Sequence, residues 1–336
     1  MLKKICIVTV FLFSCLSMVL IALGNFAERP AERKDFEIIA HRGVHQDYAG
    51  SSKGVRLDKS YLTECTATRI YKPTHDYLEN TVESIQAAFD YGATMVEIDI
   101  RPSKDDQIVV FHDWMLECRT NGLGKVIDHT VDYLKTLDIG YGYTYDGKIY
   151  PFRGKGVGKI RTLAEILKQF PGKKFLLDNK NGNDLKTANL IVDTLSQYTA
   201  EQQKLLYLWC EDEAYEFIHR RLPAITRLIL PRNQQKAFFK SYLLRLGFGS
   251  IPDRYRNQGI GLPTKYTKYI WGWPNRFLYK VYDENIRFYL YLNTVEEARE
   301  YSSLSLSGIV TDHIETVGQY YKPSQKSLLA SRHRRD

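Results

Sequence analysis

Ile38-Ile39-Ala40-His41-Arg42-Gly43 and Met95-Val96-Glu97-Ile98-Asp99 are the two stretches that decide the fold of this chain. Each is an apolar, β-branched run that ends in charged or imidazole side chains, as a buried strand does when it carries catalytic groups to its C-terminal mouth. Glu97 and Asp99 are two residues apart, so on a strand both carboxylates point to one face. Two like charges held that close favour a cation between them. The alternative is a strand with a solvated acidic face, which would leave the neighbouring histidine unexplained.

Two further apolar runs end in polar groups of the same kind. Val109-Val110-Phe111 is followed by His112, and Phe175-Leu176-Leu177 is followed by Asp178. A single histidine at a strand end is more often structural than catalytic, but two histidines associated with Glu-x-Asp reverse that expectation. Asp178 could form an ion pair with Lys180 along the strand; its place at the end of an apolar run favours a metal ligand instead.

The rest of the chain alternates between strand-like and helix-like runs. The strand-like runs are 36–40, 95–101, 174–179, 205–210, 225–230, 287–292 and 307–311, with an eighth, weakly marked, between Gly259 and Trp271. The helix-like runs are 81–91, 184–199, 212–222, 233–246 and 295–304. This order predicts an α/β fold, a TIM-type (β/α)8 barrel. Long insertions are expected after the first and second strands, at 44–78 and 121–161, where loops surround an active site in this architecture.

The N-terminus predicts export. Lys3 and Lys4 precede an uncharged apolar run from Ile5 to Leu23, long enough to span a bilayer and also compatible with a secretory signal. The basic flank should stay in the cytoplasm, which places the rest on the periplasmic or extracellular side. We therefore divide the chain into a signal peptide or membrane anchor (1–24), a linker (25–34), the barrel domain (35–321) and a polar tail (322–336).

Composition bounds the partners and the compartment. The 336 residues are 44% hydrophobic, enough for one large core, and carry a net charge of +8. Lys and Arg are scattered, so we expect a phosphate-bearing substrate or an anionic membrane surface and no nucleic acid. Outside the apolar leader the cysteines are Cys65, Cys118 and Cys210. A disulfide between the first two is compatible with an oxidising compartment, but the sequence alone does not establish it. The oligomeric state stays open.

An ordered set of short motifs resembles those of the glycerophosphodiester phosphodiesterases and covers the chain from about residue 36 to 316. The motifs are His41-Arg42-Gly43, Glu79-Asn80-Thr81, Glu97-x-Asp99, Lys104-Asp105, Val110-Phe111-His112-Asp113, Asp178-x-Lys180 and Gly308-Ile309-Val310-Thr311-Asp312. The resemblance implies metal-dependent hydrolysis of glycerophosphodiesters to an alcohol and glycerol phosphate, with either a vicinal hydroxyl or water attacking phosphorus.

The resemblance also implies a role for each candidate residue. His41 and His112 should act as the acid–base pair, Arg42 and Lys180 should neutralise the phosphate, and Glu97, Asp99 and Asp178 should hold one divalent cation. Oxygen ligands fit a hard ion, Mg²⁺ or Ca²⁺. Glu79, Asn80 and Asn293 are candidates for the outer shell of the site. Asn80 is also a candidate cap for the helix that begins near Thr81. The remaining histidines are assigned no chemistry.

Two departures from the family pattern affect specificity. The third metal ligand is usually Glu, whereas here it is Asp178. The strand near the C-terminus usually carries a Trp before the Asn, and here Leu290-Tyr291-Leu292-Asn293 keeps the Asn and lacks the Trp. Trp271 or Trp273 could supply an apolar wall, although core packing is expected for at least one of them. The same departures leave two alternatives open: a phospholipase D- or sphingomyelinase D-like activity on lysolipids, and a non-catalytic phosphate-binding envelope protein.

Overall fold

The computed structural model describes residues 19, 35–48, 65–245 and 250–321. The expected leader at Ile5–Leu23 lies outside these residues apart from Val19, and so do the linker 25–34 and the tail 322–336, so these three assignments stay predictions. Within the described part of the chain, no helix combines the length and the apolar character needed to cross a bilayer.

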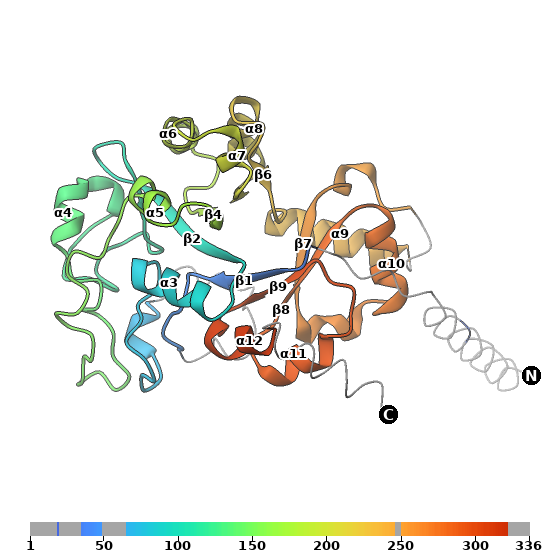
Figure 1. The fold of residues 1–336 in the computed structure, drawn as a ribbon, viewed down its shortest axis with the longest axis horizontal. Helices are drawn as coiled ribbons and strands as arrows, with labels where there is room; N and C mark the ends of the chain where they lie inside the picture. Colours follow the sequence, from blue (N-terminus) through green and yellow to red (C-terminus); the bar gives the residue numbers. More distant parts are fainter. Residues whose placement is uncertain (1–18, 20–34, 49–64, 246–249, 322–336) are drawn as a thin grey trace, which may run out of the picture.

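Parallel strands form a nearly closed barrel in the order β6-β5-β4-β2-β1-β9-β8-β7, which confirms the predicted fold (Figure 1). Their bounds are β1 Glu37–His41, β2 Met95–Pro102, β4 Lys174–Asn179, β5 Leu206–Trp209, β6 Thr226–Arg227, β7 Gly259–Pro263, β8 Arg287–Tyr291 and β9 Gly308–Thr311. The weakly marked strand is β7. The segment that follows β6 reaches the other edge strand, β7, where the Leu230 N–H donates to the Gly259 carbonyl at 2.8 Å.

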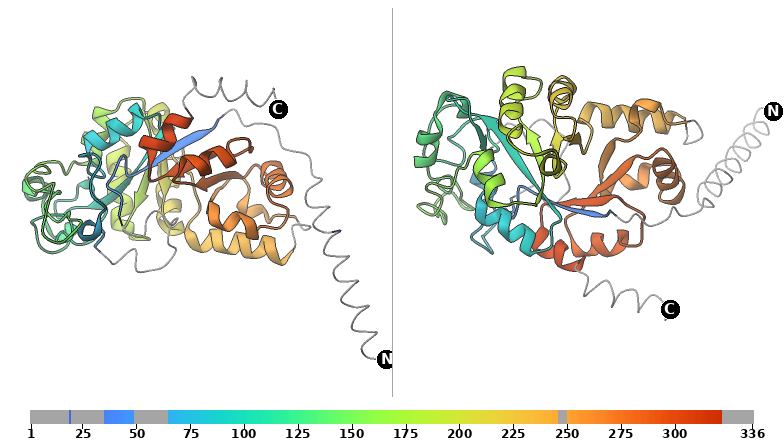
Figure 2. Two further views of the ribbon diagram at one scale, coloured as in Figure 1. Left: turned by 90° about the horizontal axis from the view of Figure 1, so that it is seen from below. Right: turned by 45° about the horizontal axis from the view of Figure 1, so that its top comes forward.

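Helices lie around the outside of the strands (Figures 1 and 2). Their bounds are α3 Val82–Asp90, α4 Val131–Thr136, α5 Leu163–Gln169, α6 Leu185–Leu195, α7 Ala200–Gln203, α8 Asp212–Arg221, α9 Arg232–Leu244, α10 Asn275–Asp283, α11 Val295–Tyr301 and α12 Ile314–Tyr320. The prediction that Asn80 caps α3 is wrong. Thr81 is the cap, because its hydroxyl accepts from the Ser84 N–H and the Ser84 hydroxyl accepts from the Thr81 N–H in return.

The pleat of the strands separates two buried clusters. Ala40, Val96 and Leu177 pack outward in the large cluster that the helices cover. Their neighbours Ile39, Met95 and Leu176 belong to a separate cluster, with Tyr289 and Val310, that fills the barrel. Because side chains alternate along a strand, the next inward positions towards the C-terminal end are His41, Glu97 and Asp178. The barrel core therefore ends in a layer of polar groups at its mouth.

The second insertion, which spans residues 103–162 in the structure, shares a buried core with the first insertion, whose contributions are Tyr48, Ala67, Ile70 and Leu78. After β2 the chain turns back as β3 (Ile108–Val110), which is antiparallel to β2 and pairs Val110 with Ile100. The residues that follow pack around Phe111, Leu116 and Phe152 in a separate buried cluster. Figure 1 shows this insertion, with α4, projecting on the opposite side of the barrel from α9 and α10. It is a compact subdomain attached at the barrel mouth.

Of the two roles expected for Trp273, an apolar wall of the site or core packing, the structure shows core packing. Its ring packs 5.9 Å from that of Phe277 and 5.8 Å from that of Phe288, both buried among the helices and strands of the barrel. Trp271 instead stacks on the guanidinium of Arg276, at 4.8 Å. The apolar wall predicted for one of these tryptophans is therefore not supplied by Trp273.

Candidate active site

Strand register assembles the predicted metal ligands. β2 and β4 pair so that Asp99 lies beside Asp178, and β1 and β2 pair so that His41 lies beside Glu97. Glu97, Asp99 and Asp178 each offer a carboxylate oxygen, and these oxygens lie within 4.8 Å of one another. Glu97 and Asp99 are buried. The structure thus brings the three carboxylates together as the spacing predicted.

The charge balance of this cluster fits a cation. Burial raises the pKa of Glu97 well above its usual range, and the negative charges of Asp99 and Asp178 add to that rise. Burial also works against ionisation of Asp99, but Lys180 and Arg42 outweigh it and hold the Asp99 pKa well below its usual range. Glu97 Oε1 is buried and has no hydrogen-bond partner among the described residues. An unsatisfied buried carboxylate oxygen facing two further carboxylates is a donor set that suits a hard divalent ion.

Lys180 lies against the carboxylates. Its ammonium is 2.8 Å from Asp99 Oδ1 and also bonds Asp178. The side chain is about one-sixth exposed, which leaves it accessible from the mouth of the barrel. The predicted phosphate-binding lysine is thus at the site, where it shares its charge with two of the predicted metal ligands.

Arg42 is held in an unusual backbone conformation. Its φ is +60°, in the left-handed region, and Gly43 follows at +75°. This turn points the Arg42 N–H at Glu97 Oε2, 2.9 Å away, and buries the side chain at 2% exposure. The guanidinium contacts Glu79 Oε1 at 3.1 Å and Asp99 Oδ2 at 3.4 Å. Arg42 therefore supplies positive charge beneath the carboxylates, and a phosphate would share it with them.

Glu79 and Asn80 reach the same cluster from the start of α3. The Asn80 side-chain amide donates to Asp99 Oδ2 at 2.7 Å, and its carbonyl accepts from the Asp99 N–H at 3.0 Å. Asn80 also has a left-handed backbone, with φ of +60°. Glu79 contacts the guanidinium groups of Arg42 and Arg119. Asn80 thus orients one carboxylate directly, whereas Glu79 acts through the arginines.

His41 stands at the end of β1 with one ring nitrogen fixed. Its Nδ1 lies 2.6 Å from Asp312 Oδ1, and its Nε2 lies 3.9 Å from Glu97 Oε2. Burial and the nearby Arg42 lower the His41 pKa, against the opposing effect of Asp312. Asn293 holds Asp312 from behind: its amide donates to Oδ2 at 3.1 Å, and its carbonyl accepts from the Asp312 N–H. Asn293 is therefore an orienting residue for His41, remote from the metal ligands.

His112 reaches the site by a different route from the one the sequence indicated. It follows β3, which runs antiparallel to the barrel, and the Phe111 N–H donates to the Asp99 carbonyl at 3.0 Å. The returning hairpin brings His112 back from the end of β2 to the level of Asp99. Its Nδ1 lies 2.7 Å from Asp113 Oδ1. Burial lowers the pKa of His112 to about 4, with Arg42 as the next cause, so the ring is neutral at neutral pH.

Four residues near the histidines were not given a role from the sequence. Asp312 and Asp113 fix the two rings, Arg119 pairs with Asp113 at 2.9 Å, and His45 Nε2 lies 3.4 Å from Asp312 Oδ1. Asp113 and Asp312 both belong to motifs quoted above, which was the only available signal. Nothing in the local sequence indicates that Arg119 or His45 turns towards the site.

A family model for the glycerophosphoryl diester phosphodiesterase family matches residues 41–316. The Bacillus subtilis protein YhdW, provisionally named a glycerophosphodiester phosphodiesterase, is 31% identical over 193 residues, 52% of this chain and 75% of its own length. A second B. subtilis protein, named glycerophosphodiester phosphodiesterase, is 33% identical over 133 residues, 38% of this chain and 40% of its own length.

Solved structures share the fold. A glycerophosphoryl diester phosphodiesterase domain from Mycobacterium tuberculosis matches with a TM-score of 0.63 at 17% identity, covering 85% of this chain and 99% of that one. An Oleispira antarctica phosphodiesterase, solved with its product sn-glycerol-3-phosphate, matches with a TM-score of 0.53 at 20% identity, covering 88% of this chain and 96% of that one. At these identities the likeness shows the fold alone. With the family match over residues 41–316, this chain belongs to the glycerophosphoryl diester phosphodiesterase family and is a phosphoric diester hydrolase.

Proposed function

We propose that this protein hydrolyses glycerophosphodiesters to an alcohol and glycerol phosphate, with His41 and His112 as the acid–base pair. The observation that carries the proposal is the matched orientation of the two rings. Each has Nδ1 within 2.7 Å of a carboxylate, Asp312 for one and Asp113 for the other. A carboxylate on Nδ1 favours the tautomer with its proton there, which leaves Nε2 to exchange protons with the substrate.

The two rings give the reaction its proton transfers. One Nε2 takes the proton from the attacking hydroxyl, which is either the vicinal hydroxyl of glycerol or a water molecule. The other must be in its imidazolium form, with a proton on both ring nitrogens, and gives its Nε2 proton to the alkoxide that leaves phosphorus. Positioned proton transfer of this kind contributes roughly 10²- to 10⁴-fold to the rate. Because His112 is neutral at neutral pH, its ring can act as the acceptor without first losing a proton.

Positive charge at the site suits a phosphodiester. Lys180, partly exposed beside Asp99 and Asp178, is the cationic side chain best placed to meet a non-bridging oxygen. We propose that Glu97, Asp99 and Asp178 hold one divalent cation, Mg²⁺ or Ca²⁺. When bound, this ion adds positive charge next to the phosphate. The Glu97 oxygen that has no partner among the described residues supports this assignment.

We also propose that the barrel acts outside the cytoplasm. The cysteine pair supports this location, because Cys65 and Cys118 form a disulfide and such bonds persist in oxidising compartments. The apolar run Ile5–Leu23 after Lys3 and Lys4 supports it from the sequence. A small-molecule phosphodiester is the substrate class, consistent with the glycerol-3-phosphate bound by the Oleispira relative.

The test is a comparison of deacylated and acylated substrates with the purified enzyme. Glycerophosphocholine and glycerophosphoethanolamine should release glycerol phosphate, detected with a coupled dehydrogenase. Chelation should stop turnover, and added Mg²⁺ or Ca²⁺ should restore it. Turnover of lysophosphatidylcholine alone would instead favour the phospholipase D-like alternative. Full activity in excess chelator would remove the metal from the proposal, and inactivity on every substrate would favour the non-catalytic alternative.

A further inference from the structure

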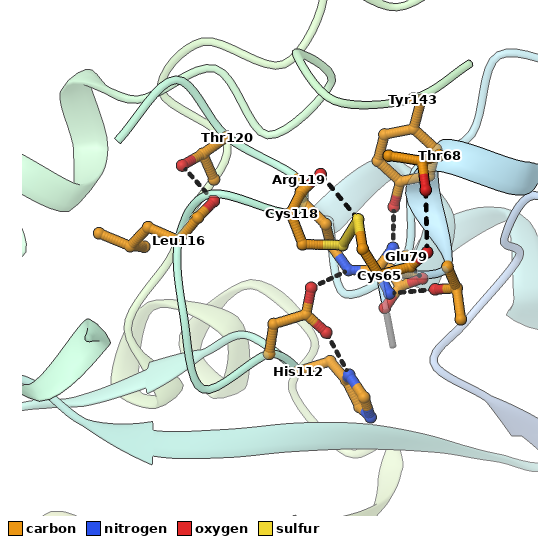
Figure 3. The surroundings of a disulfide bond; sticks show 11 residues. Cys65, Thr68, Glu79, His112, Leu116, Cys118, Arg119, Thr120 and Tyr143 are labelled. Atoms are coloured by element: carbon orange, nitrogen blue, oxygen red, sulfur yellow. Dashed lines mark hydrogen bonds and ion pairs between the residues drawn. A yellow bond between two sulfur atoms is a disulfide. The ribbon is translucent and has the colours of Figure 1, made fainter. Parts of the chain in front are cut away.

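A disulfide joins the two insertions beside the site. The residues that follow its two cysteines in the chain are hydrogen-bonded to each other. Cys65 precedes Thr66 in the first insertion, and Cys118 precedes Arg119 in the second. Arg119 Nη2 donates to Thr66 Oγ1 at 2.7 Å. The disulfide, drawn in Figure 3, and this hydrogen bond therefore form two adjacent links between the same segments.

Arg119 is buried and connected on every side. Its exposed fraction is 3%. Besides Thr66, the guanidinium contacts Asp113 Oδ2 at 2.9 Å, Glu79 Oε2 at 3.2 Å and the Tyr143 hydroxyl at 2.8 Å. Because these partners come from both insertions and from the start of α3, the guanidinium can satisfy them together only while the insertions keep their relative position.

Asp113 passes this position on to His112. One of its oxygens forms an ion pair with Arg119 Nε at 2.9 Å, and the other lies 2.7 Å from His112 Nδ1, so the carboxylate bridges the arginine and the ring. Residues 113–125 contain no regular helix or strand. Their placement depends on cross-links such as the Gly142 N–H to the Arg119 carbonyl, at 3.2 Å, and on the disulfide.

We propose that the Cys65–Cys118 disulfide positions the proton-transferring ring of His112 through Arg119 and Asp113, so that reducing the bond lowers kcat while the protein stays folded. The inference rests on the proposed function, in which His112 exchanges a proton with the substrate. Arg119 and Asp113 are positioning residues, since neither touches the reacting atoms.

The chemical step is a two-electron reduction. A water-soluble trialkylphosphine attacks one sulfur and breaks the S–S bond; water then supplies the oxygen of the phosphine oxide and the protons of two thiols. The insertion keeps its core of Phe111, Leu116 and Phe152 and the pairing of Val110 with Ile100. Cys65 and Cys118 are only partly buried and pack against this core from outside it, so the fold should survive while the Arg119 network loosens.

The experiment measures kcat and KM of the purified full-length enzyme on glycerophosphocholine in excess Mg²⁺, before and after treatment with the phosphine. Thiol titration under denaturing conditions verifies the reduction, and circular dichroism verifies the fold. We expect kcat to fall about tenfold or more, a part of the roughly 10²- to 10⁴-fold that such a group contributes, with KM within about twofold. The Cys65→Ser/Cys118→Ser double variant should have the kcat and KM of the reduced enzyme, and the phosphine should not change them. Cys210→Ser, which removes the free buried cysteine, should respond as the wild type does.

Arg119→Lys tests the route. If the effect passes through the guanidinium, this variant should already show the lower kcat, and reduction should add little to it. Unchanged kcat after verified reduction would overturn the inference, as would loss of the fold on reduction. If reduction lowered kcat by the same factor in Arg119→Lys as in the wild type, the route through the arginine would be overturned. An oxidised enzyme that is active sustains the proposed function whatever reduction does, whereas an inactive one refutes both.

Discussion

Replacing Glu97 with glutamine should stabilise the metal-free protein and greatly weaken its response to metal. In the wild type, the buried Glu97 carboxylate faces Asp99 and Asp178, and its pKa is raised because ionisation there is unfavourable. Glutamine removes that charge but keeps an oxygen to accept the Arg42 N–H, which lies 2.9 Å from Glu97 Oε2. The substitution therefore removes repulsion without removing the hydrogen bond.

The magnitude follows from the spacing. Two unit charges 4.8 Å apart, the outer limit for these oxygens, repel by about 3.5 kcal/mol at an effective dielectric constant of about 20. Lys180 and Arg42 offset part of that, and so does partial protonation of Glu97. We expect a net gain of about 1–3 kcal/mol in unfolding free energy without metal, roughly 2–6 °C in Tm for a domain of this size.

The gain should depend on pH in a defined direction. Because the pKa of Glu97 is raised in the folded protein, its contribution to stability is fully present below the ordinary Glu pKa of about 4.3. That contribution is lost as the pH rises through the raised value. The Glu97→Gln variant has no carboxyl group there to ionise, so its advantage in chelator should widen as the pH rises.

Thermal unfolding in chelator, and then in Mg²⁺ or Ca²⁺, checks both halves of the prediction. A metal at one hundred times its Kd stabilises a protein by about 2.7 kcal/mol, so the wild-type Tm should rise and the variant's should rise much less. The matched control is Glu83→Gln. Glu83 is a half-exposed carboxylate on α3 that pairs with Lys159 away from the cluster. The reasoning fails if Glu97→Gln lowers the Tm in chelator, or if metal stabilises both proteins equally.

Three further outcomes are expected. His41→Ala and His112→Ala should each lower kcat by roughly 10²-fold or more with a smaller change in KM, measured by steady-state kinetics, and near-normal kcat would make that histidine structural. Gly43→Ala should destabilise the protein by about 2 kcal/mol or more in denaturant unfolding, because φ is +75° and a Cβ would lie 2.6 Å from Ser84 Oγ; a change under about 0.5 kcal/mol would contradict this. Protease added to spheroplasts should digest the barrel from outside if Ile5–Leu23 exports it, and protection would refute that topology.

The sequence was sufficient for the barrel and for the residues that its strands carry. A carboxylate or histidine at the end of a buried strand has its position set by two local rules, alternation along the strand and parallel alignment of strand ends. His41, Glu97, Asp99 and Asp178 all obey them. The position of β7 was predicted only within a wide range, because Gly259–Pro263 has two glycines and a proline among its five residues and so has low strand propensity.

The sequence was insufficient where position depends on contacts made by irregular segments. His112 lies at the mouth because β2 extends far enough for β3 to fold back along it. The sequences of the two strands do not indicate that they pair antiparallel. Arg119 faces Asp113 because the second insertion shares a core with the first and is joined to it by a disulfide. Such contacts depend on tertiary structure, which the hydrophobic periodicity of the sequence does not predict.

The two histidines reach equivalent states by unrelated routes. His41 is delivered by a barrel strand and fixed by Asp312, the residue that directly follows the neighbouring strand β9. His112 is delivered by a hairpin and fixed by Asp113, which in turn depends on Arg119. The first ring is therefore as rigid as the barrel, and the second only as rigid as the insertions. A change in the loops that loosens Arg119 and leaves the barrel intact should therefore act more on proton transfer at His112 than on His41.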